Sequence, residues 1–281
     1  MGRVAVAEFC EHLIMLRPRI IPCLLVHQGG LVKTVKFKAS RYVGDPINAV
    51  KIFNEKACDE LVVLDIDATV DDAEPDYQMI GRLAAECRMP LCYGGGIKTP
   101  DQADRIIGLG VEKVALSSAA VTNPALVGEI ARRIGQQSVV VVIDIRPKAG
   151  LFSKGYEVVT HNAGRVLPVD PFKLAEEMQN AGAGEIVINA VDRDGTYSGY
   201  NLALAQSMKE RLHVPMTVLG GAGSLADVEQ LIAQNGLIGA CAGSIFVFKG
   251  GLKAVLINYP TPEQKDEICA RALRAGGHEF D

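Results

Sequence analysis

The sequence predicts an α/β fold, a (β/α)8 barrel built from two similar half-barrels. Two stretches resemble one another: Glu60–Asp67 reads ELVVLDID, and Glu185–Asp192 reads EIVINAVD. The Gly-rich stretch Gly94–Ile97 likewise returns as Gly220–Gly223. The chain has 281 residues, and such a barrel takes about 250. A doubly wound open sheet is the alternative, but no nucleotide-binding fingerprint follows the first predicted strand.

Eight short apolar stretches predict the strands. They are nearly continuous in apolar character and rich in β-branched residues, as is typical of parallel strands that are buried on both faces. We expect strands at Ile20–Val26, Glu60–Asp65, Leu91–Tyr93, Lys113–Ser117, Val139–Ile143, Glu185–Asn189, Met216–Leu219 and Ala240–Gly243.

Helix starts between these strands share one chemistry, a residue with a side-chain oxygen followed by proline. The oxygen accepts a hydrogen bond from a free N–H of the first turn, and proline has no N–H there to leave unpaired. We expect helices to begin at Asp45-Pro46, Thr99-Pro100, Asn123-Pro124, Asp170-Pro171 and Thr261-Pro262.

Domain organisation follows from where the repeat begins. Residues 1–14 lie outside it, so we expect an N-terminal extension outside the fold, followed by a single barrel domain over residues 15–281. Strands alternating with helices over this whole length make a closed barrel the simplest architecture.

Composition excludes several classes of partner. The net charge is −4 and no basic stripe occurs, so we expect no nucleic acid. No apolar stretch approaches about 20 residues, so we expect no membrane span. The seven cysteines contain no Cys-x-x-Cys spacing, which fits a reducing compartment and predicts a cytoplasmic protein. The five histidines show no ligand spacing, so we expect neither a metal nor a cofactor.

Glycines and serines follow strands of both halves, at the end where such barrels carry their sites. Glycine lets backbone N–H groups approach an anion closely, and the N-terminus of the next helix adds a positive partial charge. The pattern predicts a phosphate site in each half, for one ligand with a phosphate at each end. The alternative is that these glycines only make tight turns. The residues are Gly95, Gly96, Ser117 and Ser118 in the first half, and Gly220, Gly221, Gly243 and Ser244 in the second.

Carboxylates also end strands, and Asp144 is the foremost catalytic candidate because it follows five apolar residues. An aspartate there can serve as a general acid or base. The first strand carries Leu25 at the position where the fifth strand carries this carboxylate. The remaining strand-end carboxylates could equally cap loops or turns; they are Asp65, Asp67, Asp192 and Asp194.

These motifs together resemble the cyclase subunit of imidazole glycerol phosphate synthase, a TIM-barrel family. The similarity runs from about Arg19 to Tyr259 and is carried by Arg19–Leu24, Asp59–Asp65, Gly94–Ile97, Ala119–Val121, Asn123-Pro124, Gly182–Glu185, Asp192–Thr196, Gly199-Tyr200 and Gly220–Gly223. The resemblance implies a heterodimer in which a glutaminase subunit supplies ammonia through the barrel. It also implies a ligand with a phosphate at each end, bound at the far mouth with help from Lys33, Asp192 and Gly195.

The resemblance further implies an ammonia gate at the bottom of the barrel. The family has two basic and two acidic residues there, and all four positions match: Arg19, Glu60, Lys113 and Glu185. The alternative reading is that these residues are ordinary ion pairs that close the barrel floor.

The mouth departs from the family pattern while the floor does not. The family's cyclase chemistry uses two aspartates; Asp144 matches one, but Leu25 takes the place of the other. Leu219 and Ala190 stand where the family usually has hydroxyl side chains, with Asn189 beside them. Leucine cannot transfer a proton.

Some relatives of this subunit serve surface-polysaccharide pathways, where the ammonia goes to a separate amidotransferase that amidates a sugar. We therefore expect a synthase-like subunit that supports sugar amidation. The first alternative is a working lyase-type cyclase of histidine biosynthesis. The second is a non-catalytic subunit that activates the glutaminase and conducts ammonia to a third protein.

Overall fold

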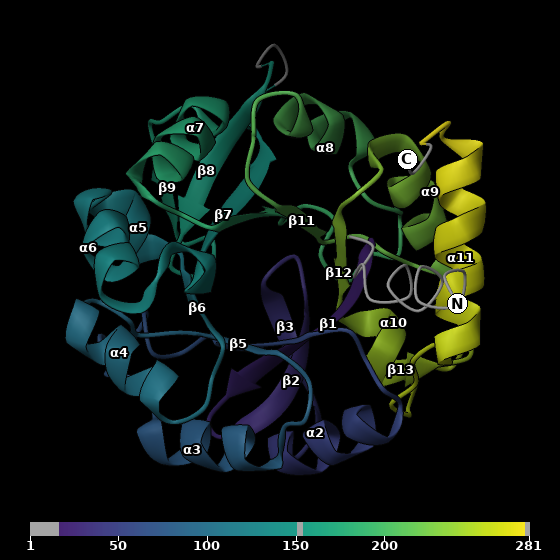
Figure 1. Cartoon of the computed structure of the whole chain (residues 1–281), viewed down its shortest axis with the longest axis horizontal. Helices are drawn as coiled ribbons and strands as arrows, with labels where there is room; N and C mark the ends of the chain where they lie inside the picture. Colours follow the sequence, from purple (N-terminus) through teal and green to yellow (C-terminus); the bar gives the residue numbers. More distant parts are fainter. Residues whose placement is uncertain (1–16, 151–153, 279–281) are drawn as a thin grey trace, which may run out of the picture.

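The computed structural model describes residues 17–150 and 154–278, and its centre is a closed barrel of eight parallel strands (Figure 1). Each strand pairs with the next, and β1 closes the ring against β12, with Ile21 opposite Cys241. The predicted (β/α)8 barrel is therefore confirmed. Its strands are β1 (Arg19–His27), β4 (Leu61–Asp65), β5 (Leu91–Gly94), β6 (Lys113–Leu116), β7 (Val139–Pro147), β10 (Glu185–Ala190), β11 (Met216–Leu219) and β12 (Gly239–Ala242).

Helices surround the barrel on its outer side (Figure 1). The longer ones are α2 (Pro46–Glu55), α3 (Tyr77–Glu86), α4 (Pro100–Gly108), α6 (Ala125–Ile134), α7 (Pro171–Ala181), α8 (Leu202–Lys209), α9 (Leu225–Asn235) and α11 (Pro262–Ala275). Two short helices, α5 (Ser118–Thr122) and α10 (Ser244–Val247), follow β6 and β12. A single 3₁₀ turn, Gln136–Ser138, precedes β7. No helix in the described ranges is long and apolar enough to cross a membrane.

Four of the five predicted helix starts have the expected cap. The side chains of Asp45, Thr99, Asp170 and Thr261 each accept a backbone N–H of the first turn, with proline at the start of the helix. The prediction at Asn123 was wrong, because α6 begins at Ala125 without a side-chain cap. Asn123 instead ends α5, where its N–H donates to the carbonyl of Ala119.

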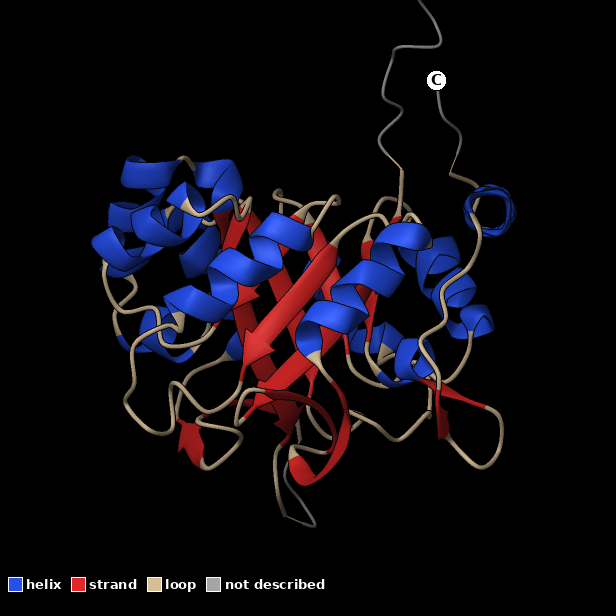
Figure 2. Ribbon diagram, turned by 90° about the horizontal axis from the view of Figure 1, so that it is seen from below, coloured by secondary structure: helices blue, strands red, loops and turns tan. Residues whose placement is uncertain are grey.

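Antiparallel strands extend the first strand of each half, and these were not predicted. In the first half they are β2 (Gly30–Val35) and β3 (Lys38–Gly44); in the second they are β8 (Tyr156–Thr160) and β9 (Arg165–Leu167). A further small hairpin, β13 (Phe248–Lys249) with β14 (Ala254–Val255), follows α10. Figure 2 shows strands continuing past one edge of the barrel, the edge at which its strands end. The shared extension supports the reading of two similar halves.

The apolar core has two parts. One lies between the strands and the surrounding helices, and the other fills the barrel interior with Ile21, Cys23, Cys92, Ala115, Val140, Val142, Val187, Leu219 and Cys241. The six cysteines among the described residues are all free thiols, and Cys10 lies outside the described ranges. The expected N-terminal extension, residues 1–14, also lies outside them, so the predicted domain boundaries stay a prediction.

Candidate functional site at the two ends of the barrel

A pocket of about 430 Å³ opens where the barrel strands end; we call it the mouth pocket. Its wall includes Gly95, Gly96, Ser117 and Ser118, the whole predicted phosphate set of the first half. Both glycines have positive φ, and a side chain on Gly95 would approach the carbonyl oxygen of Asp65 to 2.6 Å. These positions thus require glycine for the close packing of the turn, whatever else they bind.

Two cations, Lys98 after β5 and Arg165 on β9, also line the mouth pocket. Lys98 forms an exposed ion pair with Asp72, which also lines the pocket. Backbone N–H groups at the start of α5, together with cations of the pocket wall, can hold an anion in the mouth.

The phosphate set of the second half lies elsewhere. Gly220, Gly221, Gly243 and Ser244 do not line the mouth pocket. Gly221 packs against the carbonyl of Gly199. Gly243 packs against the ammonium group of Lys33, and a side chain there would overlap it. The structure therefore brings together the predicted groups of one half in the pocket, and not those of both.

Lys33 lies in the wall of the mouth pocket, almost fully buried on β2. Its ammonium group donates to the carbonyl of Cys23, and burial lowers the pKa of the lysine. The hairpin that carries Lys33 is fixed to the loop after β10: Thr34 donates to Asp194 at 2.8 Å, and Lys36 N–H donates to the Asp194 carbonyl at 2.9 Å.

The loop after β10 places its two predicted residues outside the mouth pocket. Asp192 lies in a turn and Gly195 packs against the carbonyl of Thr34 with positive φ. Asp194 does line the pocket, and burial raises its pKa in spite of the Thr34 hydrogen bond. Among the carboxylates that follow this strand, the one facing the pocket is therefore Asp194.

The carboxylates after β4 bind their own loop. Asp65 accepts the backbone N–H groups of Asp67 and Ala68 at 2.9 and 3.2 Å. Asp67 forms a hydrogen bond with the ring nitrogen Nδ1 of His27 at 2.6 Å, and it accepts a hydrogen bond from the backbone N–H of Gln28 at 2.7 Å. Both aspartates thus cap loops, although Asp65 also lines the mouth pocket and burial raises its pKa.

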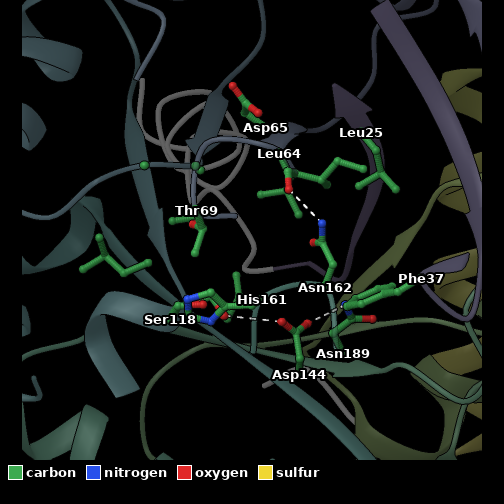
Figure 3. Close-up of a pocket in the computed structure, with 18 of the residues that line it drawn as sticks. Leu25, Phe37, Leu64, Asp65, Thr69, Ser118, Asp144, His161, Asn162 and Asn189 are labelled. Atoms are coloured by element: carbon green, nitrogen blue, oxygen red, sulfur yellow. Dashed lines mark hydrogen bonds between the residues drawn. The ribbon is translucent and has the colours of Figure 1, made fainter. Parts of the chain in front are cut away.

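Asp144 ends the barrel part of β7 and faces the mouth pocket (Figure 3). Its Oδ1 accepts the side-chain N–H of Asn189 at 2.8 Å, and its Oδ2 accepts the hydroxyl of Ser117 at 3.4 Å. Burial raises the pKa of Asp144 to about 7, more than these two hydrogen bonds lower it. A carboxyl group with that pKa can either take up or release a proton near neutral pH.

Leucine side chains lie in the pocket wall across from Asp144. Leu25 and Leu64 line the mouth pocket there (Figure 3), and Leu219, which pairs with Asn189 on the neighbouring strand, also lines the pocket. Leu25 is the residue at the position equivalent to Asp144, so the described mouth has one such carboxylate and not two.

Sequence reasoning missed the turn between β8 and β9, which contributes His161 and Asn162 to the pocket wall (Figure 3). Asn162 donates to the carbonyl of Ile66 at 2.9 Å, so the turn is tied to the far side of the mouth. Three consecutive residues here, His161, Asn162 and Ala163, have positive φ. The signal in the sequence was the turn-forming run Asn162–Gly164 after a β-branched stretch.

The opposite end of the barrel carries four charged side chains; we call them the floor ring. Arg19, Lys113 and Glu185 are the first residues of their strands, and Glu60 directly precedes β4. Arg19 binds Glu60, and it binds Glu185 at 2.7 Å. Lys113 bridges the same two carboxylates at 2.9 Å each. The predicted residues therefore form one closed network of two cations and two anions.

The two carboxylates of the floor ring are almost fully buried, while Arg19 and Lys113 keep about a quarter and a fifth of their side chains exposed. Burial alone would raise the pKa of Glu185, but Arg19 and Lys113 outweigh it and lower that pKa to about 2. Thr217 adds a hydrogen bond to Glu185 at 2.6 Å.

A small apolar cavity of about 20 Å³ lies inside the barrel between its two ends; we call it the lumen cavity. Glu60, Glu185 and Thr217 line it on the floor side. Its other lining residues include Leu64, Ala115, Val142 and Leu219, which also line the mouth pocket. The same apolar side chains thus border both the lumen cavity and the mouth pocket. Among the described residues, no group of three or more His, Cys, Asp or Glu side chains is placed to hold a metal ion.

A family model described as "Histidine biosynthesis protein" matches residues 19–253. The chain belongs to this family. It is 54% identical over 251 residues to a protein of Vibrio vulnificus, which is provisionally named imidazole glycerol phosphate synthase subunit hisF3; the match covers 89% of this chain and 96% of that one.

Two further relatives carry the same kind of provisional name, imidazole glycerol phosphate synthase subunit. The one from Leptospira interrogans is 54% identical over 254 residues, and the one from Pseudomonas aeruginosa is 48% identical over 252. Each match covers 90% of this chain and 99% of the relative. The chain is thus an imidazole glycerol phosphate synthase-like barrel of the histidine biosynthesis protein family over nearly its whole length.

Proposed function

We propose that this chain is the synthase-type barrel subunit of a glutamine amidotransferase complex, which receives ammonia from a glutaminase subunit and supplies it to a phosphorylated ligand. The observation that carries the proposal is the arrangement of three features along one axis. A charged floor ring, an apolar lumen cavity and a polar mouth pocket follow one another, and the same side chains line adjoining features.

The floor ring suits a gate for a small neutral molecule. Two cations and two anions neutralise one another, so the ring tolerates burial that an isolated charge would not. Arg19 and Lys113 are its more exposed members, and when one of them moves toward solvent each buried carboxylate still keeps the other cation. Beyond the ring, the apolar lumen favours uncharged ammonia over the ammonium ion, because burying an unpaired charge is costly.

The glutaminase is expected to dock on the face that carries the floor ring, away from the mouth pocket. We expect the complex to work in the cytosol, since the free thiols of the described cysteines suit a reducing compartment.

At the mouth, the first-half set with Gly95, Gly96 and Ser118 would hold the phosphate. Asp144 would exchange protons with the reacting nitrogen, because its pKa near 7 lets it act in either direction. Leu25 supplies no second proton-transfer group, and the apolar wall around it favours a ligand other than the family's usual one.

For this reason we propose sugar amidation in surface-polysaccharide biosynthesis as the purpose of the ammonia, with a separate amidotransferase as its final user. The cyclase of histidine biosynthesis remains the alternative that the similar proteins' names favour. A non-catalytic barrel that only activates the glutaminase and conducts ammonia is the third.

The channel is tested with the barrel and its glutaminase together. The measurement is the ratio of glutamate released to amidated product, with glutamine and then with ammonium as the nitrogen donor. Lys113→Ala should raise this ratio well above that of the wild type with glutamine and leave ammonium-dependent product unchanged. Lys51→Ala, which removes an exposed ion pair with Glu86 between outer helices, is the matched control and should not uncouple the two reactions. An unchanged ratio in Lys113→Ala, or a glutaminase that does not bind the barrel, would contradict the proposal.

The choice of ligand is tested with ammonium and the family's bis-phosphorylated substrate. Loss of one proton-transfer group costs about 10²–10⁴-fold in rate, so we expect very poor cyclase turnover. Leu25→Asp should increase that turnover, whereas Leu25→Asn, of similar size, should not. Near-normal turnover by the wild type would contradict sugar amidation and favour the cyclase of histidine biosynthesis.

A further inference from the structure

One buried acceptor at the mouth has no partner. The side-chain oxygen of Asn189, on β10, makes no hydrogen bond to any described residue, and the residue is 4% exposed. Buried polar groups are nearly always paired, so an orphaned acceptor in a pocket wall points to a ligand with a hydrogen to donate.

The orientation of this amide is fixed by its neighbour. Asn189 Nδ2 donates to Asp144 Oδ1 at 2.8 Å (Figure 3). When Asp144 is ionised, as it is at mildly alkaline pH, its carboxylate only accepts hydrogen bonds, so turning the amide over would place two acceptors against each other. In this state the Asn189 oxygen points away from Asp144, and Asn189 is one of the residues that line the mouth pocket.

Asn189 lies where the lumen cavity meets the mouth pocket. Leu64, Val142 and Leu219 belong to both walls and are apolar. Asn189 and Asp144 line only the mouth pocket, so a molecule that leaves the lumen passes apolar side chains and then meets these two polar ones.

We propose that the Asn189 side-chain oxygen and the Asp144 carboxylate form the receiving site for ammonia at the top of the barrel lumen. This inference rests on the proposed function, since it names where the conducted ammonia is held. Ammonia has three N–H donors and a single lone pair. Two acceptors can take two of its N–H groups and leave the lone pair facing the ligand in the mouth pocket. An amide oxygen suits this position because it accepts a hydrogen bond without giving a proton to the lone pair.

The test is an NMR titration of the wild-type barrel with asparagine side chains labelled at the amide carbon. Ammonium chloride is added at mildly alkaline pH, and sodium chloride of equal ionic strength is added to a second sample. The Asn189 resonance is assigned by its absence in Asn189→Ser. The chain contains its own matched control, because the Asn235 oxygen on α9 is also buried and unpaired, yet it lines neither the lumen cavity nor the mouth pocket.

Ammonium chloride should shift the Asn189 resonance in a saturable manner, and sodium chloride should not. The Asn235 resonance should stay unchanged in both. If Asn189 does not respond, or moves only as Asn235 does, the receiving site is wrong. The coupling assay of the glutaminase complex then distinguishes the receiving site from the proposed function. If the wild-type complex still couples its two reactions, only the receiving site is wrong. If the barrel binds no glutaminase, both proposals are wrong.

Discussion

The floor and the mouth of the barrel each bury a carboxylate, with opposite results. Glu185 at the floor has its pKa lowered to about 2, and Asp144 at the mouth has its pKa raised to about 7. Burial raises the pKa at both positions. The difference comes from the partners, since Glu185 has two cations and a hydroxyl, whereas Asp144 has one amide and one hydroxyl.

The comparison teaches that one barrel can keep a buried carboxylate ionised at one end and let another take up a proton near neutral pH at the other end. At the floor, each carboxylate meets both cations, so removing one carboxylate leaves two cations to share the other. At the mouth, hydrogen bonds to Asp144 are few and the facing residue is Leu25. We expect changes at the floor to affect stability most, and changes at the mouth to affect binding and pH dependence.

The largest effect should come from Glu185→Ala. The change leaves Arg19 and Lys113 sharing Glu60 alone, and breaking a buried ion network by removing one partner costs about 3–5 kcal/mol in free energy of unfolding. Urea unfolding measures it. Glu176→Ala is the control, because its ion pair with Arg211 is exposed, and such pairs contribute about 0–1 kcal/mol. Equal losses in the two variants would mean that the floor ring is no more than a surface network.

The floor ring could be predicted from the sequence more completely than the mouth pocket. The floor residues were found because charges at the start of apolar strands are conspicuous and match a known pattern. All eight strands were found for the same reason, their continuous apolar runs. The extensions β2–β3 and β8–β9 were missed since β3 is largely exposed and β9 has only three residues, so neither gives an apolar period.

The mouth was harder to predict because its pocket depends on contacts between distant loops. Gly220 and Gly221 repeat the first-half glycines in sequence, yet the pocket wall contains only the first-half set. The packing of Gly221 on Gly199 and of Gly243 on Lys33 decides this. His161 and Asn162 reach the pocket through a turn whose position depends on the hydrogen bond to Ile66. No local pattern contains that information.

At the mouth, Asp144→Asn should increase stability at high pH. The native pKa of Asp144 lies above its ordinary value, so the native state binds the proton more tightly than the unfolded state, and wild-type stability falls as the pH rises from about 4 to about 7. Asparagine has no such proton to lose. A shift of about three pKa units corresponds to about 4 kcal/mol, so we expect the variant to be more stable than the wild type by up to about that amount near pH 8, and by about half of it near pH 5.

Urea unfolding of both proteins at the two pH values measures this difference. Subtracting the two curves cancels other groups that titrate in the same direction, such as Asp65 and Asp194. A difference that does not change with pH would mean that Asp144 keeps an ordinary pKa in the folded protein.

Binding of inorganic phosphate can show whether the first-half set and the second-half set contribute equally to an anion site. Ser118→Asp adds a negative charge to the wall of the mouth pocket, where the proposed anion site is open. Like-charge repulsion there should weaken phosphate binding by about tenfold or more, which is about 1.4 kcal/mol. Ser244→Asp is the matched change in the second half and should have a smaller effect. Titration calorimetry measures both affinities, and equal losses would restore the prediction of two equivalent phosphate sites.

The smallest effect tests how much a single hydrogen bond contributes to the floor. Thr217 donates to Glu185 at 2.6 Å from a fully buried position on β11. Thr217→Val keeps the shape of the side chain and removes the donor, and a typical hydrogen bond contributes about 1 kcal/mol. Because Arg19 and Lys113 still neutralise Glu185, we expect a loss of about that size by urea unfolding. The Thr217→Val change in the Glu185→Ala background should then cost almost nothing, since the acceptor is already gone. A loss of the same size in both backgrounds would show that Thr217 stabilises the floor by packing and not through the ring.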